Sequence, residues 1–184
     1  MKQFSSKFVA MLLVATFILS TAATVSLSAQ TPTQMEEQIF TLVNVQRMQN
    51  NLPPLVWCDF LAQAARAHSV DMAENNLPGH IGSDGSSVEH RINRVIPSGI
   101  THLYTTVAEN LAAGHATAEA IVQHWMNSAV HRNAILNPVS THSAVGFHTT
   151  GQHATQVLAA GAHRVLLGKI LISVVLLWLH LLFL

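Results

Sequence analysis

The residues with the clearest chemical potential in this sequence are its 12 histidines. An imidazole binds metals and exchanges protons near neutral pH, because its ordinary pKa is about 6.5. No His-Glu-x-x-His pattern occurs, so spacing alone does not predict a metal site. Most of the histidines stand singly in predicted loops, where a solvated side chain is the ordinary interpretation, as for His102, His115 and His142.

Nucleophilic catalysis has little support in the sequence. Cys58 is the only cysteine and lies in an apolar run, which favours a buried and unreactive thiol. No Gly-x-Ser-x-Gly elbow occurs. A single cysteine also excludes an internal disulfide, so the fold must be held together by packing.

The predicted elements that would position these residues are helices first and a β-hairpin last. Thr33 with Glu36 predicts a capping box at the start of a helix that runs to about residue 50. Asp59 is the predicted N-cap of a second helix, whose inner stripe includes His68 as a packing residue. Further elements are predicted as helices over 87–94, from Thr117 to Trp125 and from Ser128 past His131, and as strands over 143–149 and 153–158. This order is typical of a layered α+β domain.

The composition indicates one folded domain between two apolar ends. Apolar residues make up 49% of the chain and charged residues 10%, and the excess lies at the termini. Residues 1–29 have the layout of a signal peptide, residues 30–160 the length of one domain, and residues 161–184 form an apolar tail. If helical, residues 165–184 would span about 30 Å, enough for a transmembrane anchor. The alternatives are a removed lipid-anchor signal, for which the polar spacer is missing, and a reading-frame artefact. Nine basic and nine acidic residues give no basic surface for nucleic acid.

Several segments carry recognisable motifs. They read LPPLVWCDFLAQAARAHSVDMAENN at 52–76, GH followed by SDGSS and HRI at 79–92, AENLAAG at 108–114, HWMNSAVHRNAIL at 124–136 and VGFHTTGQHATQV at 145–157. In this order they resemble the CAP (SCP-like) superfamily of extracellular proteins, in its bacterial type. The resemblance implies an α-β-α sandwich, with a small antiparallel sheet between helical layers.

The same resemblance implies a surface cleft lined by histidine and glutamate. His80 matches the family's loop histidine, and Glu109 matches its first glutamate. Ser128 stands where the second glutamate is expected, so the full set of four is incomplete. His153 fits the second histidine, and His131 is the histidine that bacterial members keep instead.

Two interpretations of this cleft are open. His80, Glu109, His131 and His153 could supply nitrogen and oxygen ligands to Zn²⁺, with one position left for water. The alternative is a hydrogen-bonded polar cluster without a metal. We therefore expect an exported binding module for a small lipid, a sterol or a cell-envelope component, secreted or held at the cell surface. The rival hypotheses are a metal-dependent hydrolase and a structural surface protein.

Overall fold

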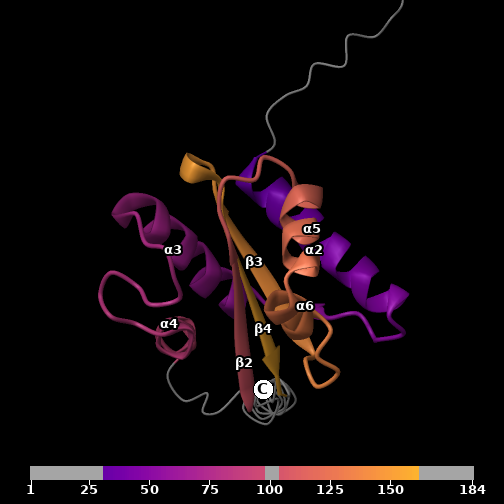
Figure 1. Ribbon diagram of the computed structural model, residues 1–184. Helices are drawn as coiled ribbons and strands as arrows, with labels where there is room; N and C mark the ends of the chain where they lie inside the picture. Colours follow the sequence, from indigo (N-terminus) through magenta and orange to yellow (C-terminus); the bar gives the residue numbers. More distant parts are fainter. Residues whose placement is uncertain (1–30, 98–103, 162–184) are drawn as a thin grey trace, which may run out of the picture.

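The computed structural model describes residues 31–97 and 104–161 of the chain (Figure 1). The predicted signal peptide, the predicted anchor at 165–184 and His102 lie outside these residues. Within the described ranges, no helix is both long enough and apolar enough to cross a membrane.

Four strands form the central sheet, in the order β1-β3-β4-β2. Their bounds are Val56–Trp57 for β1, Thr106–Ala112 for β2, His142–His148 for β3 and His153–Ala160 for β4. β4 pairs antiparallel with β2 and β3, whereas the two-residue β1 pairs parallel with β3. The predicted hairpin is confirmed, with a short 3₁₀ turn at Thr150–Gln152. β1 and β2 were not predicted as strands; β1 is very short, and the sequence TVAENLA of β2 places polar residues in mid-strand.

Helices cover both faces of the sheet, as Figure 1 shows. One layer consists of α2 (Pro32–Gln49), α5 (Ala118–Asn127) and α6 (Ala129–Ile135), and the other of α3 (Asp59–Asn75) and α4 (Val88–Val95). Each layer has its own apolar cluster against the sheet, which includes the fully buried Trp125 in the first layer and Leu61 in the second. The expected α-β-α sandwich is therefore confirmed, and its sheet is antiparallel except for the β1–β3 pair.

The capping box predicted at Thr33 and Glu36 is wrong, because the structure has it two residues earlier, at Thr31 and Gln34. The N-cap is Thr31, whose hydroxyl accepts from the Gln34 amide while the Gln34 side chain accepts from the Thr31 amide. Pro32 fits the first helical position because it has no N–H to satisfy. Glu36 is instead 1% exposed, where it accepts from the Arg66 guanidinium and from the backbone of Phe147.

Two further predicted caps differ from the structure. Cys58, not Asp59, is the N-cap of α3, and Asp59 accepts a hydrogen bond from the Trp57 indole. Ser128 is the N-cap of α6 as predicted, but its side chain makes no capping hydrogen bond. Thr117 caps α5 as predicted, through the amide of Ala120.

A close approach between α3 and β3 fixes the spacing of the second layer. A Cβ at Gly146 would overlap the backbone of Ala65 and Arg66, so only glycine lets the helix lie this near the strand. The hydroxyl of Ser69 donates to the Gly146 carbonyl at 3.0 Å, which uses a buried polar group at the contact. His68 is next to Ser69 on α3 and is fully buried, so this contact also holds His68 close to the sheet.

We expect Gly146→Ala to lower the free energy of unfolding by about 3 kcal/mol or more, because the new methyl group must push α3 away from β3. Urea denaturation followed by circular dichroism measures the change. Gly79→Ala is the matched control, since a Cβ there meets nothing within 4 Å. Equal stability of the two variants would contradict the close approach.

Candidate functional site

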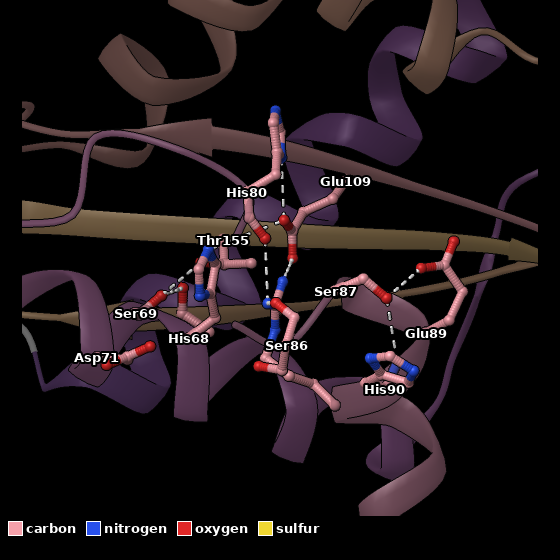
Figure 2. A network of polar contacts seen from close by, with 12 residues as sticks. His68, Ser69, Asp71, His80, Ser86, Ser87, Glu89, His90, Glu109 and Thr155 are labelled. Atoms are coloured by element: carbon pink, nitrogen blue, oxygen red, sulfur yellow. Dashed lines mark hydrogen bonds and ion pairs between the residues drawn. The ribbon is translucent and has the colours of Figure 1, made fainter. Parts of the chain in front are cut away.

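The centre of the candidate site is the carboxylate of Glu109 on β2. Its side chain is only 3% exposed. Oε2 accepts from Nη2 of Arg91 at 2.7 Å, and Oε1 lies 3.0 Å from Nδ1 of His80 (Figure 2). The structure thus brings together the loop histidine and the strand glutamate that the sequence singled out, and it adds a buried arginine to them.

Arg91, on α4, also fixes the loop that carries His80. Its Nη1 donates to the carbonyl of His80 at 3.1 Å and to the carbonyl of Ser86 at 2.9 Å. The Arg91 side chain is 5% exposed. Hydrogen bonds are stronger away from water, so these bonds hold the loop firmly in place. The motif at 79–92 contains Arg91, but its role was not predicted; the available signal was an arginine four residues after Ser87, the last serine of the loop.

His68, on α3, forms the buried side of the site. Its side chain is 0% exposed, and Nε2 lies 3.1 Å from the Gly79 carbonyl and 3.9 Å from Oε1 of Glu109. Because Nε2 must donate to that carbonyl, the neutral ring presents its lone pair at Nδ1, which is buried without a hydrogen-bond partner. Burial lowers the pKa of His68, and the Glu109 charge only partly opposes this. The predicted packing role is consistent with this environment.

His80 is the exposed member of the cluster. Its side chain is 57% exposed, in contrast to the buried carboxylate beneath it. A carboxylate accepts only, so Nδ1 of His80 carries the proton in the contact, and in the neutral ring Nε2 is left as the acceptor. The arrangement can therefore present an oriented lone pair to a molecule in solvent.

His131 approaches the site from the opposite helical layer. It lies on α6, and its carbonyl accepts from the side chain of Asn110 on β2 at 3.2 Å. Its Nδ1 is buried without a hydrogen-bond partner. Burial lowers the pKa of His131, and the neighbouring charges of His124 and then His80 lower it further. His131 is thus within electrostatic range of His80, although no contact joins it to Glu109 among the described residues.

The structure does not bring the other two predicted residues to this cluster. His153 opens β4 opposite His148, and Glu109 pairs with Val157, four residues further along that strand. Four strand residues span about 13 Å. Burial, followed by the charge of His148, lowers the pKa of His153. Ser128 remains at the start of α6 as its N-cap.

The residues present do not fit the Zn²⁺ site considered from the sequence. Within residues 31–97 and 104–161, no group of three or more His, Cys, Asp or Glu side chains could hold a metal ion. The Glu109 carboxylate is bound by a guanidinium, whose positive charge opposes a second cation at the same oxygens. His153 lies too far along β4 to complete the set. The arrangement corresponds to the hydrogen-bonded polar cluster instead.

An α-β-α sandwich whose edge strand carries a buried glutamate under a loop histidine defines a class of protein. The family model of the cysteine-rich secretory proteins, or CAP family, matches residues 40–160. This match covers more than half of the 184 residues, so the chain belongs to the CAP family.

Curated relatives come from Bacillus subtilis. The protein YkwD is 37% identical over 121 residues, which are 66% of this chain and 45% of YkwD. The membrane protein YlbC is 36% identical over 115 residues, which are 62% of this chain and 32% of YlbC. The chain therefore spans less than half the length of these relatives.

Solved structures agree with the family. An extracellular protein containing an SCP domain from Bacillus anthracis is 31% identical with a TM-score of 0.63, and the match covers 72% of this chain and 45% of that one. An outer surface protein of Borrelia burgdorferi has a TM-score of 0.59 at 19% identity, with 68% and 92% covered. The second likeness shows the fold alone.

We expect Arg91→Met to destabilise the protein by about 3 to 5 kcal/mol, because it leaves the Glu109 carboxylate buried without its cation. Adding Glu109→Leu to this variant should restore most of the loss, since both charges are then absent. Urea denaturation measures both effects. His80→Ala serves as the control and should cost less than about 1 kcal/mol, because its imidazole is largely solvated. Similar costs for Arg91→Met and His80→Ala would refute the buried pair.

Stability should fall as the pH drops from about 7.5 to 5. Burial holds the pKa of His68, His131 and His153 below the ordinary value of 6.5, so below that pH the unfolded chain binds more protons than the folded one. Urea denaturation at both pH values tests this, and His68→Gln should flatten the dependence. His90→Gln, at an exposed position on α4, should leave it unchanged. A stability that rises on acidification would show the sign to be wrong.

Proposed function

We propose that this chain is exported and that its CAP domain works outside the cell as a binding module. Two observations support export. Residues 1–29 have the layout of a signal peptide, and the Bacillus anthracis protein that is 31% identical is described as extracellular. The tail at 165–184 is long enough to hold the domain at the outer face of a membrane.

The observation that carries the binding proposal is the contrast between His80 and the groups beneath it. The imidazole is 57% exposed, whereas Glu109 and Arg91 are 3% and 5% exposed. A buried ion pair therefore orients a solvent-facing ring, whose Nε2 accepts a hydrogen bond from a ligand hydroxyl or amine. A preoriented group loses less conformational entropy on binding than a freely rotating one.

Binding is a better fit than hydrolysis because of what Arg91 does to Glu109. Both carboxylate oxygens of Glu109 are already engaged within the domain, Oε2 by Arg91 and Oε1 by His80. The metal-dependent alternative needs several ligands around one point, and the described residues do not supply such a group. Glu109 is instead a positioning residue for the His80 ring.

A second surface supports a small apolar ligand as an alternative occupant. A groove between α2 and α5 has a volume of about 340 Å³, which falls in the range of small-molecule sites. Its lining combines apolar and polar side chains and consists of Leu42, Gln46, Glu119, Val122, Gln123 and Met126. A fatty acid or sterol would bury its hydrocarbon here, in the helical layer opposite to His80.

One experiment decides between the two surfaces. The protein is purified after export, and bound small molecules are extracted and measured by mass spectrometry. We expect His80→Ala to lower the amount of co-purified compound about fivefold, which corresponds to one hydrogen bond of about 1 kcal/mol. Met126→Gln, in the groove, should leave that amount unchanged.

The control for this experiment is His90→Ala, which removes an exposed imidazole from the same layer without touching the cluster. A loss confined to Met126→Gln would assign the ligand to the groove. If the wild-type protein carries no small molecule at all, the binding proposal fails and a structural role at the cell surface takes its place.

A further inference from the structure

β2 is an edge strand of the central sheet, and it carries Glu109 of the candidate site. Among residues 31–97 and 104–161, the strand order β1-β3-β4-β2 leaves β4 as the only strand that pairs with β2. The opposite edge is formed by the two-residue β1, whereas β2 has seven residues, Thr106–Ala112. Figure 1 shows β2 with α4 on one side and α6 on the other. A free edge of this length is a template for a further strand.

The backbone of Glu109 is accessible at this edge. Its side chain is 3% exposed, but the residue as a whole is half-buried, so the remaining accessible surface belongs to the main chain. The next residue, Asn110, is only 1% exposed. In an antiparallel pair, alternate residues point both N–H and C=O away from the partner strand. This alternation assigns the outward direction to Glu109 and, with a period of two, to Val107 and Leu111.

Most of these outward groups are unused within the domain. The Leu111 carbonyl accepts from the indole of Trp125 at 2.9 Å, so a helix and not a strand satisfies it. Outside the ladder with β4, no hydrogen bond between described residues involves the main chain of Val107 or Glu109. β2 also contains neither proline nor lysine, which commonly block an edge. Val107 and Glu109 therefore each offer an N–H and a C=O to a second strand.

The charge of the domain indicates which kind of chain this edge attracts. All nine acidic residues lie in the described part of the sequence, together with five arginines and no lysine. Two of those arginines, Arg91 and Arg94, are already paired with carboxylates. The excess negative charge attracts a basic peptide and repels a second copy of the same domain.

We propose that β2 binds an extended basic peptide as an added strand of the sheet. Main-chain hydrogen bonds to Val107 and Glu109 would supply affinity, and the peptide side chains would alternate between the layer of His80 and the layer of α6. A lysine or threonine on the first side supplies the donor that Nε2 of His80 accepts. This inference rests on the proposed function, because it names the class of ligand for the same site.

The probe is a capped heptapeptide, acetyl-Thr-Lys-Thr-Lys-Thr-Lys-Thr-amide, which alternates β-branched and basic residues. Isothermal titration calorimetry with the purified full chain measures its affinity. Two N-methylated forms, at peptide positions 3 and 5 or at positions 4 and 6, remove N–H donors from opposite edges of the peptide. We expect one form to bind at least about tenfold more weakly than the other, because only one edge of the peptide faces β2.

Hydrogen exchange of the backbone amides, followed by NMR, provides an internal control that needs no variant. The amides of Val107 and Glu109 should become protected when the peptide binds. Those of Ala108 and Asn110 already face β4 and should change little. Equal weakening by both N-methylated forms, unchanged exchange at Val107 and Glu109, or no measurable binding of the peptide would overturn the proposal.

Two variants and a second peptide test the side-chain contacts. His80→Ala should weaken peptide binding about fivefold, the effect of one lost hydrogen bond. His90→Ala, at an exposed position on α4, should leave it unchanged. The matched peptide with glutamate in place of lysine should bind at least about tenfold more weakly, and equal affinity for the two peptides would overturn the preference for a basic ligand.

The remaining outcomes separate this inference from the proposed function. Peptide binding that His80→Ala leaves unchanged would support the added strand and contradict the proposed role of His80. A co-purified small molecule without any peptide binding would support the proposed function and overturn the added strand. Protection of Val107 and Glu109 that rises with protein concentration in the absence of peptide would also overturn it, because a second copy would then occupy the edge.

Discussion

The carboxylate of Glu109 lies in the interior of the domain, and an ionised group there is costly unless charge and hydrogen bonds replace water. Arg91 supplies both, at 2.7 Å from Oε2, and the same guanidinium binds two carbonyls of the loop that carries His80. A single buried cation therefore connects the edge strand, α4 and the loop between α3 and α4. The position of the His80 ring follows from this connection, because its Nδ1 needs the oxygen that Arg91 leaves free.

The helical layers on both faces of the sheet allow the ion pair of Glu109 and Arg91 to be buried. α3 lies against β3 at Gly146, so the buried His68 on the same helix lies beside Glu109, with Nε2 at 3.9 Å from Oε1. α6 contacts β2 from the other layer, and Asn110 binds the carbonyl of His131 there. Neighbouring residues of β2 thus serve opposite layers, as strand geometry requires. For this reason Glu109 and Asn110 bind histidines on opposite faces of one strand.

Much of the fold and part of the site could be predicted from the sequence. Helical periodicity and turn residues located α3, α4, α5 and the final hairpin, and motif resemblance located His80 and Glu109. Arg91 was missed because a buried arginine has no sequence signature until its carboxylate partner is known, 18 positions away. His153 matched a motif, but the register of β4 against β2 decides its distance from Glu109, and single sequences do not reveal register. The capping pair moved to Thr31 because Pro32 sets the helix start.

The partner of a carboxylate decides what a histidine beside it can do. A glutamate that is hydrogen-bonded to an imidazole alone can share a proton with it, which suits catalysis. In this domain the guanidinium has the shorter contact, at 2.7 Å against 3.0 Å for the imidazole, so the negative charge is already compensated before any substrate arrives. The imidazole gains orientation from Glu109. An oriented acceptor at the surface is suited to recognition, and this is the physical reason for proposing binding at this site.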